Sequence, residues 1–285
     1  MRSCFSAVIF LIGGVAGVAA CHRTQASPEQ PVGRAPAVGA DLTADLDRVR
    51  QARIFFSHHS VGGNVLAGVE SLYREAGRPG FKLVDLKDVL EEKGPGWIEG
   101  VGGKNGAPRS KIDFFAETIR KEKALQPRIA FMKFCYVDFN PHTDVDELFG
   151  HYASTLAALK REHPEITFAH VTAPLMRRPT EIKWRILRLM GRMVWEDDAN
   201  VKRHRFNQRL LKEFAADPIF DLARAESTRP DGSRETFTHG DGVFHSLEPS
   251  YTNDGGHLND LGQRVVGAEM VRFVSKALQA SSRTL

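Results

Sequence analysis

The segment Arg53-Ile-Phe-Phe-Ser-His-His-Ser-Val-Gly-Gly-Asn64 predicts a buried strand that turns abruptly into a helix. The apolar run from Ile54 to Phe56 is typical of a strand covered on both faces. The two glycines permit a tight turn, and Asn64 is a favourable N-cap for the amphipathic segment Val65 to Ala76. Ligands of open parallel sheets bind where the strands end, so this turn is expected at a functional edge.

Ser60 lies at the predicted carboxyl end of that strand, directly before the helix. A helix N-terminus supplies free backbone N–H groups that hold a developing negative charge. Ser60 is therefore a candidate nucleophile, and its own N–H is a candidate donor to an oxyanion. The alternative, from this segment alone, is that His-His-Ser only caps the helix.

A second polar segment, Tyr251-Thr-Asn-Asp-Gly-Gly-His-Leu-Asn-Asp-Leu-Gly262, precedes the last helical pattern of the chain. It sets Asp254 and His257 three residues apart, with two glycines between them. A nucleophilic serine needs a base within hydrogen-bond reach, and that base needs an acidic group to orient its ring. One short loop is able to present both groups.

A serine in the first strand-to-helix turn, followed far downstream by Asp-x-x-His, resembles the SGNH (GDSL-like) hydrolase family. The resemblance covers most of the chain beyond about Gln51. Members of that family are three-layer α/β/α domains that hydrolyse esters of lipids, sugars or small acyl compounds. The resemblance implies Ser60 as the nucleophile, His257 as the base and Asp254 as the acid that orients it.

The chain departs from the family pattern in two places. His-His-Ser-Val replaces the usual Gly-Asp-Ser-Leu block, and Cys135-Tyr-Val-Asp138 is the nearest counterpart of the usual Gly-x-Asn-Asp block. Val137 therefore stands where the asparagine of the oxyanion hole is expected. Glycine-rich backbone after the second strand and an amide after the third are possible substitutes. The candidate oxyanion donors are Ser60, Gly103, Asn105, Gly106 and Asn140.

Strands and helices alternate beyond Ala76, which is typical of a parallel sheet with crossover helices. The expected fold is an α/β, three-layer α/β/α sandwich with a central, mostly parallel five-stranded sheet, flavodoxin-like and of the SGNH hydrolase type. Residues Gly94 to Gly106 are expected to form a loop. The expected strands are Ile54–Phe56, Lys82–Leu86, Arg128–Tyr136, Ile166–Thr172 and Pro218–Leu222.

The first residues predict export. Arg2 precedes an apolar run from Phe5 to Ala20 that ends Val18-Ala-Ala-Cys21. A basic start, a short apolar region and small residues before the cut are typical of a secretory signal, and the cysteine makes it resemble a bacterial lipoprotein signal. An ordinary signal peptide with an incidental cysteine is the alternative.

The predicted division of the chain is a signal peptide at 1–20, a flexible tether at 21–40 and the SGNH-hydrolase-like domain at 41–285. The chain is then an exported lipoprotein of the bacterial cell envelope, in the periplasm or on the outer membrane, anchored to a membrane through lipid on Cys21. Cys135 remains the single cysteine of the domain, so no intramolecular disulfide is expected.

Residues 176–197 form a basic amphipathic insertion in which six Arg and Lys residues alternate with apolar residues and tryptophans. Such a segment lies on an anionic membrane, covers an acyl pocket as a lid, or packs on the domain as a helix. The chain has a net charge of +4, and its basic residues are concentrated between Met176 and Arg209. They accompany no recognisable nucleic-acid motif, so no nucleic-acid partner is expected.

Three functions remain open from the sequence. The first is a serine esterase acting on a small acyl, glycan or lipid ester, for which no cofactor and no metal are expected. The second is a non-catalytic binding lipoprotein that kept the fold and lost its oxyanion hole. The third is a zinc site, although the spacing of its ligands matches no known zinc motif. Its possible ligands are His58, His59, His239, His245, His257 and Asp254.

Overall fold

The computed structural model describes residues 39–192 and 194–281, so the predicted signal peptide, nearly all of the tether and Cys21 lie outside the described residues. The helices are α1 (Ala40–Arg50), α2 (Val61–Glu75), α3 (Pro108–Lys121), α4 (Val145–Glu162), α5 (Ile182–Leu189), α6 (Trp195–Glu213), α7 (Leu222–Ser227) and α8 (Asp260–Ser281). The strands are β1 (Arg53–Ser57), β2 (Leu83–Asp85), β3 (Gly96–Gly100), β4 (Ile129–Met132), β5 (Thr167–Phe168), β6 (His170–Val171), β7 (Ile219–Phe220), β8 (Thr236–His239) and β9 (Gly242–His245). Short 3-10 turns are η1 (Leu86–Asp88), η2 (Tyr136–Asp138) and η3 (Pro249–Tyr251).

The central sheet has five strands in the order β2-β3-β1-β4-β5, and every pair in it is parallel. Next to it, β6 and β7 form a separate parallel pair, and β8 and β9 form an antiparallel hairpin. The expected α/β fold with a central five-stranded parallel sheet is therefore confirmed, although the membership of the sheet differs from the prediction.

One strand of the central sheet was not predicted, and neither was the β8-β9 hairpin. Gly96–Gly100 is β3, although the whole segment Gly94 to Gly106 was expected to be a loop. A side chain at Gly100 would place its Cβ 2.8 Å from the ring of Phe55, and one at Gly96 would place it 2.9 Å from the carbonyl of Lys82. Close packing of this strand thus requires glycine at both ends. Because glycines are typical of loops, the sequence contains no indication of a strand here.

Three of the predicted strands are shorter or placed differently. Of the segment Arg128–Tyr136, only Ile129–Met132 is a strand, β4, and Tyr136 begins η2. The segment expected to be the fourth strand is divided at Ala169, whose N–H donates to the carbonyl of Ala130 before the chain turns toward β7. The segment expected to be the fifth strand is β7, which pairs with β6 and is not assigned to the five-stranded sheet.

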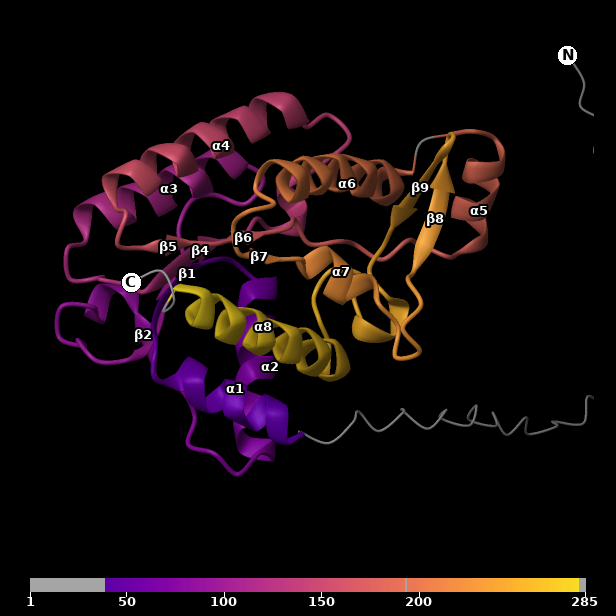
Figure 1. The fold of residues 1–285 in the computed structure, drawn as a ribbon. Coiled ribbons are helices and arrows are strands. Elements are labelled where there is room, and N and C mark those ends of the chain that lie inside the picture. The colour runs from indigo at the N-terminus through magenta and orange to yellow at the C-terminus, as the bar shows by residue number, and fades with distance from the viewer. Residues whose placement is uncertain (1–38, 193, 282–285) are drawn as a thin grey trace, which may run out of the picture. The chain divides into compact units, whose positions relative to one another are not determined.

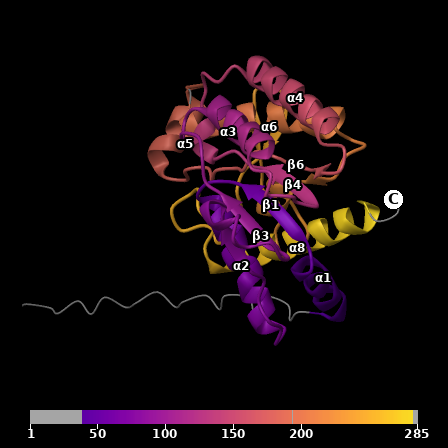
Figure 2. The same ribbon diagram turned by 90° about the vertical axis from the view of Figure 1, so that its left-hand side faces the viewer.

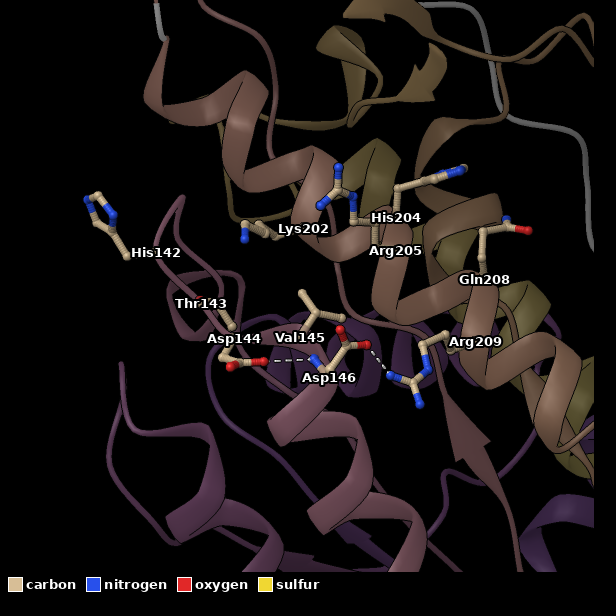
Figure 3. Close-up of a pocket in the computed structure, with 10 residues that line it drawn as sticks. All are labelled: His142, Thr143, Asp144, Val145, Asp146, Lys202, His204, Arg205, Gln208 and Arg209. Carbon is tan, nitrogen blue, oxygen red and sulfur yellow. Dashed lines mark hydrogen bonds and ion pairs between the residues drawn. The ribbon is translucent and has the colours of Figure 1, made fainter. Parts of the chain in front are cut away.

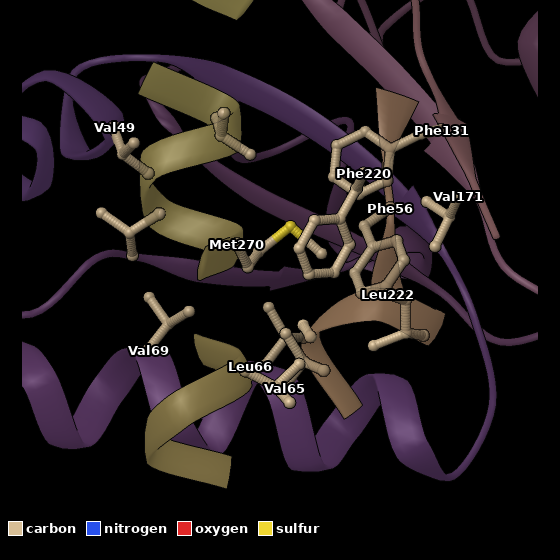
Figure 4. Packing of buried hydrophobic residues seen from close by; sticks show 14 of the residues in the cluster. Val49, Phe56, Val65, Leu66, Val69, Phe131, Val171, Phe220, Leu222 and Met270 are labelled. Carbon is tan, nitrogen blue, oxygen red and sulfur yellow. The ribbon is translucent and has the colours of Figure 1, made fainter. Parts of the chain in front are cut away.

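Alternate residues of β1 enter two different cores. Ile54 and Phe56 pack with α1, α2 and α8, whereas Phe55 packs with α3, α4 and α6. Figures 1 and 2 show these two groups of helices on opposite faces of the sheet. In Figure 4, Phe56 lies beside Phe220, Phe131 and Met270 of α8. The buried hydrophobic residues of both cores lie between Leu42 and Leu278.

The order of the strands reverses at β1. The chain passes from β1 to β2 and β3 on one side of it, and α3 then returns the chain to β4 on the other side. The carboxyl ends of β1, β3 and β4 consequently meet at a topological switch point, where α/β sheets bind their ligands. Ser60, the segment Gly102 to Gly106 and the segment Cys135 to Asp138 follow these three strands.

Helices α2 and α8 cross at two glycines. A Cβ on Gly68 would lie 1.9 Å from the carbonyl oxygen of Gln263, and a Cβ on Gly267 would lie 2.8 Å from the backbone carbon of Gly68. The two backbones are therefore in direct contact. This contact sets the distance between the turn at the start of α2 and the loop that leads into α8.

No helix in the described ranges is both long and apolar enough to cross a membrane.

Candidate active site

Ser60 occupies a strained backbone position at the end of β1. Its φ of 45° and ψ of −96° are rare for a residue with a side chain, and α2 begins directly after it at Val61. The side chain makes no capping hydrogen bond to α2. Its Oγ instead lies 2.9 Å from Nε2 of His257, so the hydroxyl faces an imidazole and not the helix.

The helix begins earlier than the sequence indicated, so Asn64 lies inside α2 and is not its N-cap. Its Oδ1 accepts the N–H of Leu258 at 3.2 Å. Asn64 thereby ties α2 to the residue next to His257, which helps to hold the imidazole over Ser60.

A buried lysine supports the Ser60 turn from below. Lys133 donates through Nζ to the carbonyls of His59, at 3.0 Å, and Phe134, at 2.9 Å. Burial lowers the pKa of Lys133 to about 8. On the other side of the turn, Nε2 of His59 donates to the carbonyl of Gly102 at 2.7 Å. The backbone before Ser60 is thus held at the carbonyl and at the side chain of His59.

Asp254 and His257 interact within one short loop. Nδ1 of His257 lies 2.6 Å from Oδ2 of Asp254, while Oδ1 accepts the N–H groups of Gly256 at 2.9 Å and His257 at 2.8 Å. Partial burial opposes ionisation, but the Gly256 N–H and both donors of His257 outweigh it and hold the pKa of Asp254 well below its usual range. Because Nδ1 donates to the carboxylate, Nε2 is left to accept the proton of Ser60.

The imidazole of His257 stands against an aromatic ring. The ring of Tyr136 in η2 meets it edge to face, with centroids 5.3 Å apart. A Cβ on Gly256 would lie 2.7 Å from the Tyr136 ring, so this approach requires glycine. The His257 side chain remains 42% exposed and that of Asp254 57% exposed, which leaves the pair accessible to a substrate.

The candidate oxyanion donors do not all remain available. The N–H of Gly106 donates to Oδ1 of Asp138 at 2.9 Å, so the prediction that it faces an oxyanion is wrong. Asn140 is held in its own turn, because its backbone N–H donates to Thr143 at 2.9 Å and its Oδ1 accepts the N–H of His142 at 2.8 Å, and these two bonds do not use its amide Nδ2. Val137, where an asparagine was expected, is 41% exposed and offers no donor.

Besides the amide of Asn140, three candidate donors remain. The N–H groups of Ser60 and Gly103 make no hydrogen bond to any residue that the structure describes. Gly103 has a φ of 76°, and a Cβ there would lie 2.8 Å from the backbone of Lys111. Asn105 accepts Nζ of Lys111 through Oδ1 at 2.8 Å, which leaves its amide N–H groups for another partner.

Two buried ionic groups near the site were not predicted from the sequence. Asp138 accepts Nζ of Lys111 and the N–H of Cys135, both at 2.6 Å, and so joins α3 to the turn after β4. Lys133 is the second group. The sequence signal is its position directly after the apolar run Ile129–Met132, because the strands of a parallel sheet are buried on both faces.

The residues of the possible zinc site have separate partners. His58 faces Glu99, His239 faces Asp198, and Nδ1 of His245 faces the carbonyl of Glu235. Throughout residues 39–192 and 194–281, no three His, Cys, Asp or Glu side chains are grouped to hold a metal ion. The arrangement gives this alternative no support.

A pocket of about 620 Å³ lies between α6 and the start of α4 (Figure 3). It is polar, and an ion pair between Asp146 and Arg209 lies along one side. The lining residues are His142, Thr143, Asp144, Val145, Asp146, Lys202, His204, Arg205, Gln208 and Arg209. Ser60, Asp254 and His257 are not among them, so this pocket is distinct from the hydrogen-bonded trio.

Comparison with known proteins gives matches only among solved structures. No family model matches the chain. No curated protein matches it either.

Three of the similar structures illustrate the likeness. One is described as a lipolytic protein of the G-D-S-L family from Desulfitobacterium hafniense (10% identity, 78% of this chain and 99% of that chain, TM-score 0.44). Another is a carbohydrate esterase of family 3 from Talaromyces cellulolyticus (13%, 80% and 97%, TM-score 0.44). The periplasmic domain of a lipopolysaccharide acetyltransferase from Salmonella Paratyphi A is a third (13%, 82% and 88%, TM-score 0.46).

At 10–13% identity and TM-scores of 0.44 to 0.46, these structures assign neither a family nor an activity to this chain.

Proposed function

We propose that the chain is a serine ester hydrolase in which Ser60 is the nucleophile, His257 the base and Asp254 the acid that orients the base. The observation that carries the proposal is the unbroken hydrogen-bond chain from Ser60 Oγ through both ring nitrogens of His257 to Asp254. It begins at a strained turn that presents the hydroxyl at the switch point of the sheet.

The geometry supports acyl transfer in two steps. Oγ of Ser60 bonds to the carbonyl carbon of the ester while its proton passes to Nε2 of His257, and Asp254 stabilises the imidazolium. The ester's alkoxy group then leaves as an alcohol, taking that proton. Water, deprotonated by His257, attacks the acyl-Ser60 ester, releases the acid and restores the hydroxyl.

Negative charge on the carbonyl oxygen requires donors at the start of α2. The N–H of Ser60 is favourably placed for this because it lies at the N-terminus of the helix. Gly103 and the amide of Asn105 are the further donors we propose. Since a single donor contributes about 10²–10³-fold to kcat in other serine hydrolases, the absence of a donor at Val137 is expected to make turnover slow unless Asn105 supplies one.

The test is turnover of an activated acetyl ester by the wild-type protein and by Ser60→Ala. The hydroxyl has no helix-capping role, so its removal is expected to abolish turnover while the melting temperature stays close to that of the wild type. Ser154→Ala, an exposed serine on α4, is the matched control and should leave turnover unchanged. Near wild-type turnover by Ser60→Ala would exclude the mechanism.

A non-catalytic binding lipoprotein is the second candidate, because Val137 removes a donor that the family pattern supplies. The same assay separates the two functions. A wild-type protein that hydrolyses no activated ester, under conditions where it is folded, favours the binding protein.

The proposal extends to location. The signal-like first residues support an exported protein anchored through lipid on Cys21, acting on an acyl, glycan or lipid ester of the cell envelope. Replacing Cys21 by serine in the producing cell should move the protein from the membrane to the soluble fraction, or stall its processing. A Cys21→Ser protein that still fractionates wholly with membranes after a high-salt wash, which weakens binding through surface charges, would contradict lipid on Cys21 as the anchor.

A further inference from the structure

Helix α5 and the residues after it expose large apolar side chains. Ile182 is 73% exposed, Ile186 50%, Leu189 88% and Met190 62%, and α5 has no buried residue. Their spacing of four, three and one residues places them on one face of the helix. A helix packed on the domain accounts for the half-buried Trp184, Leu187 and Arg188, but not for these exposed apolar side chains.

The same segment carries cations that no acidic partner neutralises. Lys183, Arg185 and Arg192 are exposed, and in the described part of the chain none of them pairs with a carboxylate. Two other arginines behave differently: Arg178 and Arg188 both bind the buried carboxylate of Asp197. The segment is thus fastened to the body of the domain, while its outer surface combines apolar and free basic groups.

The segment also lies next to the candidate active site. The N–H of Arg177 donates to the carbonyl of Gly255 at 2.8 Å, inside the loop that carries Asp254 and His257. Farther out, the guanidinium of Arg178 stacks on Phe237 of β8, and Figure 1 shows α5 beside the β8-β9 hairpin at one end of the molecule. The segment thus runs from the loop that carries Asp254 and His257 outward to α5.

We propose that the apolar face of α5 docks on an anionic lipid surface, which presents this end of the domain to the membrane. Apolar side chains enter the boundary between headgroups and acyl chains, and the exposed cations pair with anionic headgroups. A second copy of the chain fits this face poorly, because a symmetric contact brings the same cations together. This docking depends neither on the proposed hydrolase activity nor on lipid at Cys21.

The test measures partition onto vesicles with a protein that begins at Gly39, since the hydrophobic core residues lie between Leu42 and Leu278. The wild-type domain should sediment with vesicles of equimolar phosphatidylglycerol and phosphatidylcholine, and less with phosphatidylcholine alone. The double variant Ile186→Glu, Leu189→Glu should lower the partition coefficient about tenfold or more. Leu90→Glu, at an exposed leucine beyond β2, is the control and should change nothing.

A second variant tests whether the exposed cations of the segment contribute to binding. Replacing Lys183, Arg185 and Arg192 by glutamine should weaken binding to the anionic vesicles by about fivefold per charge and leave binding to phosphatidylcholine unchanged. The proposal is overturned if the wild-type domain does not bind anionic vesicles, or if the Ile186→Glu, Leu189→Glu variant binds them equally well. A wild-type dimer that this variant dissociates, without vesicle binding, would show that a second copy covers the face.

Discussion

A serine that caps a helix and a nucleophilic serine look alike in a sequence, and the difference at Ser60 is one of backbone direction. With φ at 45°, its hydroxyl turns away from α2 and toward Nε2 of His257. The turn is tight enough that a Cβ on Gly62 would lie 2.3 Å from the ring of His58. The surrounding residues therefore hold Ser60 in its strained backbone conformation, and such strained residues are common at active sites.

His257→Ala is expected to lower kcat/KM on the order of 10⁴-fold or more, because without the imidazole nothing accepts the proton of Ser60. Asp254→Asn should cost less, although its amide would donate toward Nδ1 and favour the wrong tautomer. His239→Ala, on the β8-β9 hairpin, is the matched control. Deleting His257 or Asp254 without loss of activity would refute the assignment.

What the sequence predicts about single residues depends on how local their partners are. Asp254 and His257 lie three residues apart, and the structure brings them together with Ser60, while their roles remain predictions. The direction of Gly106 was not readable, because its N–H is taken by Asp138, which lies 32 residues farther along the chain. A hydrogen bond of that separation leaves no pattern in the neighbouring sequence.

Among the elements, the helices were easier to predict than the strands. Asp144 precedes α4 as a favourable N-cap residue and accepts the N–H groups of Asp146 and Glu147, and Asn259 caps α8 by accepting the N–H of Gly262. Caps and helical periodicity are local signals. The strand β3 was missed because its first and last residues are glycines that the packing requires. The predicted fourth strand is divided at Ala169 because β5, before it, pairs with β4, whereas β6, after it, pairs with β7.

The crossing of α2 and α8 predicts a coupling between stability and activity. Gly68→Ala places a Cβ into the backbone of α8, so the helices must separate and the His257 loop must move away from Ser60. We expect a melting temperature lower by about 4 °C or more, together with reduced kcat. Gly150→Ala on α4 meets no atom within 4 Å and should be neutral or stabilising. Full activity and stability in Gly68→Ala would contradict the described contact.

For the molecule as a whole, buried charge is concentrated beneath the site. Lys133, Arg203 and Glu226 are fully buried, and Glu226 accepts the N–H of Leu175 at 2.7 Å. Burial raises the pKa of Glu226 to about 8, in spite of the nearby cations. The carboxyl group is therefore neutral in the folded protein at pH values where it is ionised in the unfolded chain.

This difference predicts how stability changes with pH. Between the ordinary glutamate pKa of 4.5, which applies to the unfolded chain, and the folded value of about 8, the folded state holds a proton that the unfolded state has lost. The contribution of Glu226 is therefore complete below pH 4.5 and is lost as the pH rises toward 8. Glu226→Gln should flatten the fall of melting temperature between about pH 5 and 8, whereas Glu213→Gln, at an exposed position, should not. If the melting temperature falls with pH equally steeply in the wild type and in Glu226→Gln, the Glu226 carboxyl group is ionised in the folded protein.

Covalent labelling tests most directly whether His257 activates Ser60 as a nucleophile. A fluorophosphonate should attach to the wild-type protein with a stoichiometry of one, and peptide mass spectrometry should place the adduct on Ser60. Labelling should be absent in Ser60→Ala and strongly slowed in His257→Ala. An adduct on another residue, or equal labelling rates in the wild type and His257→Ala, would contradict the account.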